Sequence, residues 1–171
     1  QKMVDPGLMP VALANPISAD MAVMRTSLWS GLLQTAVYNL NRQQSRVRIF
    51  EAGQCFVSAS NGKAGAVLGL AQNMALAGLI CGARTSTGWT ANKDKVDFYD
   101  IKGDLESLLG ITGLAAEFTF DAGIHPALHP GQSAALSRNG LQVGWVGQLH
   151  PKIQADQGIN TPVYLFQVDV E

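Results

Sequence analysis

Charge is scarce in this chain. Only 15% of its 171 residues are Asp, Glu, Lys or Arg, against roughly a quarter in soluble proteins. Twelve basic residues face thirteen acidic ones, the formal net charge is -1, and no block of either sign occurs. Domains that bind nucleic acid carry a basic excess or stripe, because phosphate contacts dominate their affinity. The composition therefore argues against direct binding of nucleic acid. So little charge also indicates a surface partly covered by a partner subunit.

Cysteine is scarce as well. Cys55 and Cys81 lie in separate strand-like segments, and no Cys-x-x-Cys spacing occurs. A structural zinc site or a redox pair is therefore not expected. We expect two buried free thiols. Together with the lack of a signal-peptide pattern and of an apolar run of transmembrane length, they predict a cytoplasmic protein.

Several motifs of common enzyme classes are missing. The sequence has no Gly-x-Ser-x-Gly, no Walker loop and no His-Glu-x-x-His, so these hydrolase, nucleotidase and metalloprotease chemistries are not expected. No glycine fingerprint opens a βαβ unit, which argues against a Rossmann domain.

Length and apolar content predict one domain with a sizeable core. The hydrophobic share is 47% of the 171 residues, which is typical of a globular chain. Prolines and glycine predict a connector over residues 1–19, which leads into a domain over residues 20–171. Because the chain begins at Gln1 and a predicted strand runs to its end, we expect a piece of a larger polypeptide.

Two amphipathic helices are the clearest local predictions. The first follows Thr26, Ser27 and Ser30, which offer capping oxygens. It continues to about Asn41, with one apolar face made of Trp29, Leu32, Leu33, Ala36, Val37 and Leu40.

The second helix begins near Asp97 and has Phe98, Ile101, Leu105, Leu108 and Leu109 on one face. Gly110 is expected just past its end. Glycine inside a helix costs about 1 kcal/mol relative to alanine, so Gly103 predicts a close helix or sheet contact at that point.

The remaining segments favour strands. The best hairpin is joined by Asn139-Gly140, a pair typical of a type I′ turn, and its second arm is expected to carry Leu141, Val143 and Trp145 on one face. A short helix should lie between Pro151 and Gly158. Together these signals predict an α+β fold with a mainly antiparallel sheet flanked by helices. The extended segments are expected over 20–26, 47–56, 67–70, 74–81, 116–121, 133–137, 141–149 and 163–170.

Histidine and carboxylate clusters offer weak metal-site patterns. His125 and His129 have the spacing of a helical metal pair, but a proline follows each one and favours extended backbone. His150, also followed by proline, is expected just before a helix. A cation site on the second helix is conceivable, but a solvated polar face is the favoured interpretation of its carboxylates Asp97, Asp100, Asp104 and Glu106.

Arginines are the residues that would hold a phosphate. Arg46 and Arg48 alternate with apolar residues on a predicted strand, so they share one face and could point into a cleft. Positions facing solvent are the more common outcome for arginine. Arg84 is a third candidate.

Seven short motifs occur in one order along nearly the whole chain. Together they resemble the beta subunit of bacterial phenylalanine–tRNA ligase (phenylalanyl-tRNA synthetase). They are Asn15–Ser18 (NPIS), Met24–Leu28 (MRTSL), Gly31–Leu33 (GLL), Ile49–Gly53 (IFEAG), Asp97–Asp104 (DFYDIKGD), His129–Gly131 (HPG) and Gly144–Pro151 (GWVGQLHP).

The resemblance implies a class II aminoacyl-tRNA synthetase-like core that does not catalyse. In that family the alpha subunit makes phenylalanyl-adenylate from ATP and phenylalanine and charges the tRNA. The beta module packs against alpha in an (αβ)₂ heterotetramer. The family's magnesium-binding carboxylates lie in an upstream module. No catalytic, cofactor-binding or metal-binding residue is therefore carried over to this chain, although the whole enzyme uses ATP and Mg²⁺.

This chain also departs from the pattern of catalytically active class II members, which agrees with a core that does not catalyse. Active members hold ATP with one arginine in a strand-loop-strand motif and a second that opens a late helix. Here Gly53-Gln54-Cys55 lacks a cation where many family members carry arginine, and the junction Gly147–His150 also lacks one. Ser30 replaces a frequent proline. The long helix that usually precedes this segment is missing, which implies a module incomplete at its N-terminus.

Two other functions stay open at this level. One is a nucleotide-binding enzyme domain that uses Arg46, Arg48 or Arg84 on phosphate, and the other is a module that contacts tRNA directly. Aromatic residues concentrate in interface cores, so Trp29, Trp89 and Phe98 are candidates either for contact with alpha or for the core.

Overall fold

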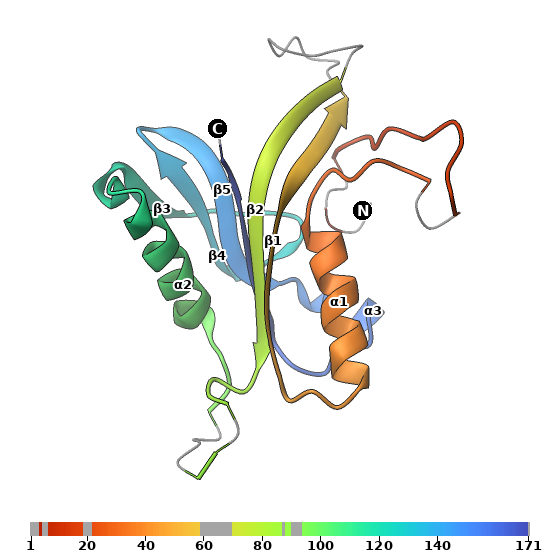
Figure 1. Ribbon diagram of the computed structural model, residues 1–171. Helices are drawn as coiled ribbons and strands as arrows, with labels where there is room; N and C mark the ends of the chain where they lie inside the picture. The colour runs from red at the N-terminus through yellow and green to blue at the C-terminus, as the bar shows by residue number, and fades with distance from the viewer. Residues whose placement is uncertain are drawn as a thin grey trace.

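The last strand of the chain lies in the middle of the sheet. The computed structural model describes residues 4, 7–18, 22–58, 70–86, 88–89 and 94–170. Its six strands have the order β1-β2-β6-β5-β4-β3, and every neighbouring pair is antiparallel (Figure 1). The predicted α+β class with a mainly antiparallel sheet is confirmed. The elements are α1 (Trp29–Asn41), β1 (Arg46–Ser58), β2 (Leu70–Gly82), α2 (Phe98–Ile111), a 3₁₀ turn (Ala115–Glu117), β3 (Phe118–Ala122), β4 (Leu128–Arg138), β5 (Leu141–Leu149), α3 (Pro151–Asp156) and β6 (Val163–Asp169).

Helices cover both faces of the sheet. α1 and α3 pack on one face and α2 on the other (Figure 1). Alternation along the strands supplies two separate cores: Leu79 and Leu165 point to the α1 side, whereas Ile80 and Phe166 point to the α2 side. Within the described residues, no helix has the length and apolar character needed to cross a membrane.

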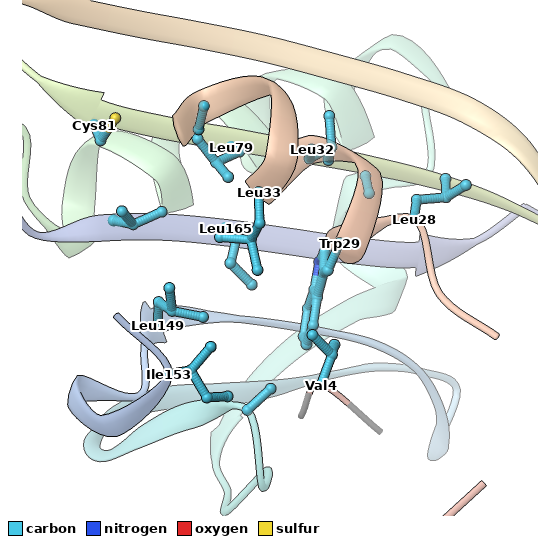
Figure 2. Close-up of a cluster of buried hydrophobic side chains, with 14 of the residues drawn as sticks. Val4, Leu28, Trp29, Leu32, Leu33, Leu79, Cys81, Leu149, Ile153 and Leu165 are labelled. Carbon is cyan, nitrogen blue, oxygen red and sulfur yellow. The ribbon is translucent and has the colours of Figure 1, made fainter. Parts of the chain in front are cut away.

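The core on the α1 side is built around the predicted apolar face of α1. Leu32 and Leu33 of this helix lie over Leu79 and Leu165, as Figure 2 shows, and Leu149 and Ile153 close the far end. Both cysteines are buried thiols in this core, as predicted. The apolar periodicity of residues 29–41 therefore located the helix and its buried face correctly.

Parts of the expected connector belong to the folded body. Val4 is only 4% exposed and packs into the α1-side core. Ala12 forms an isolated antiparallel bridge with Val23, which agrees with the predicted extended backbone at Val23. Residues 20, 21 and 67–69, which belong to two predicted extended segments, lie outside the described part of the chain.

The predicted end of α2 is wrong by three residues. Gly110 lies inside the helix, and the backbone turns at Gly113, which has φ +72°. Thr112 closes the last turn, because its backbone N–H and its hydroxyl both donate to the Leu109 carbonyl oxygen. Glycine adopts a positive φ without the steric cost of a Cβ, and here the residue with positive φ is Gly113.

Gly103 does not make the close contact that its place in α2 predicted. Apart from its chain neighbours and the nearby backbone of its own helix, a Cβ at this position would meet no described atom within 4 Å. Gly78 is the opposite case, since a Cβ there would lie 2.4 Å from the Phe166 ring. Close packing therefore requires a glycine on β2, not in the middle of α2.

A β-bulge in the hairpin's second arm places Val143 and Trp145 on opposite faces of the sheet, whereas the prediction placed them on one face. The Asn139-Gly140 turn has positive φ at both residues, as predicted. The register then shifts, because Ser137 pairs with Gln142 and Leu136 pairs with Gly144. The extra residue, Val143, packs against the α2-side core, whereas Trp145 packs against the α1-side core.

Replacing the two glycines should have opposite effects on stability. Gly103→Ala should raise the free energy of unfolding by up to about 1 kcal/mol, because alanine is the better helix former and the space is open. Gly78→Ala should lower it by about 1–3 kcal/mol, because the Phe166 ring must shift. Urea unfolding of both variants checks this, and a loss of stability in Gly103→Ala would contradict the open space described for α2.

Thiol reactivity should report unfolding. Burial raises the pKa of the Cys81 thiol to about 11, so the folded protein keeps this thiol protonated near pH 8.5, where an ordinary cysteine is about half ionised. Alkylation by iodoacetamide at that pH, followed by mass spectrometry, should label Cys81 only as fast as the protein opens. Labelling at the rate of a free peptide thiol would show that the β2 core is not closed.

Candidate functional site

A groove on the α2 side of the sheet contains one arginine, and that arginine is paired. The groove encloses about 390 Å³ between α2 and strands β1, β2 and β6. Arg48 Nη2 lies 2.5 Å from Asp104 Oδ2 of α2. The other side chains of the lining are apolar, including Phe50, Leu76 and Phe166. A phosphate entering here would have to displace a carboxylate from the one guanidinium within reach.

The neighbouring groove repeats this arrangement. It encloses about 340 Å³ at the C-terminal end of α2 and shares Leu76 and Leu108 with the first groove. Its arginine, Arg138, donates from Nε to Glu117 Oε2 at 2.8 Å. Each groove therefore presents one guanidinium, already bound to a carboxylate.

Arg46 and Arg48 share one face of β1, as the alternation predicted, but they do not line the same groove. Arg46 is not part of the groove lining. Its Nε is buried without a hydrogen-bond partner in the described part of the chain.

Arg84 binds two carboxylates at the start of α2. Asp97 and Asp100 form a capping box, in which each side chain accepts the other residue's backbone N–H. Arg84 lies across both carboxylates, with Nη2 2.7 Å from Asp97 Oδ2 and Nε 3.0 Å from Asp100 Oδ2. The hydrogen bond and the charge of Asp100 raise the pKa of Arg84. Burial, together with the charges of Asp97 and Asp100, raises the pKa of Tyr164.

The four carboxylates at the start of α2 and along it are paired with basic side chains. Their side chains are 20–51% exposed, in agreement with the favoured interpretation of a solvated polar face, and each also has a basic partner. Asp97 and Asp100 bind Arg84, Asp104 binds Arg48, and Glu106 binds Lys102 one turn away.

Arg25 is a fourth paired arginine, which sequence reasoning did not single out. Its guanidinium lies over Gly53, where a Cβ would be 2.1 Å from Nη2. Nη1 is 2.5 Å from Glu51 Oε1, and Nε donates to the Gln54 carbonyl oxygen at 2.7 Å. These bonds attach the segment before α1 to β1. The Glu51-x-Gly53 pattern was the available signal, because a glycine two residues after a carboxylate leaves room for a guanidinium.

The three His-Pro pairs share one local structure. In each, the imidazole Nδ1 accepts the backbone N–H two residues later, which is the first one available because proline has none. The donors are Ala127, Gly131 and Lys152 for His125, His129 and His150 respectively. His129 lies in β4 and His150 caps α3, as expected for histidines before prolines and before a helix.

The two places where the resemblance would put phosphate-binding arginines can now be located. β1 and β2 form the strand pair of the first, where Gln54 is exposed on β1. β5 and α3 form the strand-to-helix junction of the second, where His150 is the N-cap residue.

The three aromatic residues that were candidates for an interface differ in exposure. Trp29 is 2% exposed and belongs to the core, Phe98 is half-buried, and Trp89 is fully exposed.

Comparison with known proteins identifies relatives of the whole segment. Residues 1–170 match the family model described as the phenylalanyl tRNA synthetase beta chain CLM domain. The phenylalanine–tRNA ligase beta subunit of Pseudomonas fluorescens is 50% identical over 167 residues, which cover 98% of this chain and 20% of that protein. The beta subunit of Pseudomonas syringae pv. tomato is 48% identical over the same shares. The chain thus spans about a fifth of the length of these curated relatives.

A solved structure shares the fold at low sequence identity. The pyrrolysyl tRNA synthetase PylSc of Desulfitobacterium hafniense is similar with a TM-score of 0.57 and 14% identity, over 91% of this chain and 50% of that one. At this identity the likeness concerns the fold alone. The family model and the curated relatives together show that the chain belongs to the family of the phenylalanyl-tRNA synthetase beta chain CLM domain.

Proposed function

We propose that this chain is a non-catalytic structural and assembly module of the beta subunit of phenylalanine–tRNA ligase. In this proposal the whole enzyme attaches phenylalanine to tRNA(Phe) in the cytoplasm with ATP and Mg²⁺, and the alpha subunit contains the active site. Membership of the beta chain family supports the assignment. The likeness to a pyrrolysyl tRNA synthetase supports a core of the class II synthetase type.

The observation that carries the proposal is the pairing of the arginines. Transfer of an adenylyl group needs cations aimed at the triphosphate. Arg48, Arg84 and Arg138 are instead bound to carboxylates of the same chain. Binding ATP at Arg48 would require breaking its contact with Asp104 and placing the triphosphate in an otherwise apolar groove. The alternative of a nucleotide-binding domain that uses Arg46, Arg48 or Arg84 therefore receives no support from this geometry.

The low charge and the exposed apolar side chains of the surface support an assembly role. The chain has a low charge content, and large apolar side chains are exposed on it, among them Phe50 at 78% and Trp89 at 107%. Aromatic residues of this kind are enriched in protein interfaces. We therefore propose the alpha subunit as the partner, within an (αβ)₂ heterotetramer. A net charge of -1 favours contact with tRNA through the full complex, not through this module alone.

The chain alone should not activate phenylalanine. Purified chain mixed with ATP, Mg²⁺, phenylalanine and labelled pyrophosphate should give no exchange of label into ATP, because Arg48 and Arg84 are bound to carboxylates and Arg46 does not line the groove. Alpha subunit with full-length beta subunit is the positive control. Exchange above the background of a heat-denatured sample would overturn the proposal. So would calorimetric binding of ATP-Mg that Arg48→Ala abolishes, which would favour the nucleotide-binding alternative.

The chain should bind the alpha subunit. Hydrogen exchange followed by mass spectrometry, measured with and without purified alpha, should show backbone amides that become slower only in the complex, because an interface excludes water from them. Bovine serum albumin in place of alpha is the control. If no amide gains protection at alpha concentrations that saturate full-length beta, the assembly role of this module is wrong.

A further inference from the structure

β1 is a long edge strand without the usual protection. Its 13 residues form one edge of the sheet (Figure 1), and all of them pair with β2 without a shift in register. Proteins usually keep edge strands short, bulged or interrupted by proline, because an open row of N–H and C=O groups can pair with another chain. The opposite edge, β3, follows this rule with 5 residues. β1 therefore offers a template for a further strand.

Two hydrogen bonds show which residues of β1 face outward. The Phe56 N–H donates to the Arg25 carbonyl oxygen at 2.8 Å, and the Gln54 carbonyl oxygen accepts from Arg25 Nε at 2.7 Å. Both groups point away from β2, and alternate residues of an antiparallel strand direct their N–H and C=O groups to the same side. The segment before α1 thus covers the last part of the outer edge. The outward residues before that part are Arg46, Arg48, Phe50 and Ala52.

We call these four residues the open edge. In the part of the chain that the structure describes, no backbone group bonds to their outward N–H or C=O groups. Their side chains do not screen the edge from solvent either, because Phe50 is 78% exposed and Arg48 and Ala52 are also exposed. The open edge is therefore accessible to a second strand.

One two-fold arrangement satisfies the whole open edge. If two copies of β1 lie antiparallel with Ile49 at the axis, Arg46 faces Ala52 and Arg48 faces Phe50, and each pair occurs twice. Every outward N–H then meets a C=O of the other copy, because directly opposed residues of this kind exchange both hydrogen bonds. A contact that uses the same patch on both copies is closed, as in most two-fold dimers.

The neighbouring registers are less favourable. With Arg48 at the axis, two arginines would lie directly opposite each other, which is destabilising. With Phe50 at the axis, Arg46 would face Gln54, whose carbonyl oxygen already accepts from Arg25. With Ile49 at the axis, the exposed Phe50 ring lies beside the Arg48 side chain of the second copy, whose aliphatic stem can cover it while the guanidinium stays bound to Asp104.

We propose that the open edge pairs with the open edge of a second copy of this chain, so that two six-stranded sheets join into one. Analytical ultracentrifugation from about 1 μM to about 1 mM should show a reversible dimer. Amide exchange followed by NMR should slow at the four residues of the open edge as the chain concentration rises. Val47, Ile49 and Glu51 donate toward β2 and should exchange slowly at every concentration.

The exchange measurement also separates this contact from other modes of association. A monomer at every concentration would overturn the proposal. So would a dimer in which the open-edge amides exchange as fast as in the monomer, because its interface would lie elsewhere. Protection of these amides only after alpha subunit is added would assign the open edge to alpha and not to a second copy.

A proline in the open edge should remove the contact while β1 stays paired with β2. Ala52→Pro deletes an outward N–H, which an edge strand tolerates, and should weaken the dimer at least about tenfold, because the two-fold contact loses two hydrogen bonds. Ala52→Ser retains the N–H and is the matched control, with a dissociation constant within about twofold of the unchanged chain. Near-UV circular dichroism verifies the native fold of both variants.

Equal dimerisation of folded Ala52→Pro and Ala52→Ser would contradict the pairing. If Ala52→Pro does not fold, the amide exchange of the unchanged chain still decides, because it needs no substitution.

Discussion

The insertion of β6 between β2 and β5 is the constraint on which the structure depends. It joins two units that are each local in sequence, the β1–β2 pair and the β3–β4–β5 meander, into one sheet. Because β6 is central, its alternating side chains serve both cores, with Leu165 under α1 and Phe166 under α2. It also accepts the Trp29 indole N–H and caps the start of α1 through Gln167. A change in the register of β6 by one residue would exchange the two faces and remove all of these contacts at once.

The second organising feature is the use of arginine as a structural connector. Arg25 attaches the chain before α1 to β1, Arg48 joins β1 to α2, and Arg84 fixes the start of α2. These pairs are partly exposed, so each adds little stability by itself. A carboxylate beside a guanidinium also offsets part of its positive charge, so a paired arginine attracts a triphosphate less than an unpaired one would. In the described part of the chain, these three arginines connect elements of secondary structure.

Local signals in the sequence predicted the local structure well. Apolar periodicity located α1, Asn139-Gly140 located the hairpin turn, and Pro151 located α3, because each depends on only a few neighbouring residues. Features that depend on distant contacts were not predictable. The position of β6, the bulge at Val143 and the open space beside Gly103 follow from packing across the sheet. Among the site residues, the shared face of Arg46 and Arg48 followed from strand alternation, but the pairing of Arg48 with Asp104 required the position of α2.

The state of the arginine side chains tests the account most directly. In nitrogen-15 NMR of the guanidinium groups, the Nε–H signals of Arg25, Arg84 and Arg138 should be protected from exchange with water, because each donates to an oxygen of the same chain. Addition of ATP-Mg should leave their positions unchanged. Two or more of these signals shifting together along one saturation curve would contradict the account, because it would show guanidinium groups converging on a bound nucleotide.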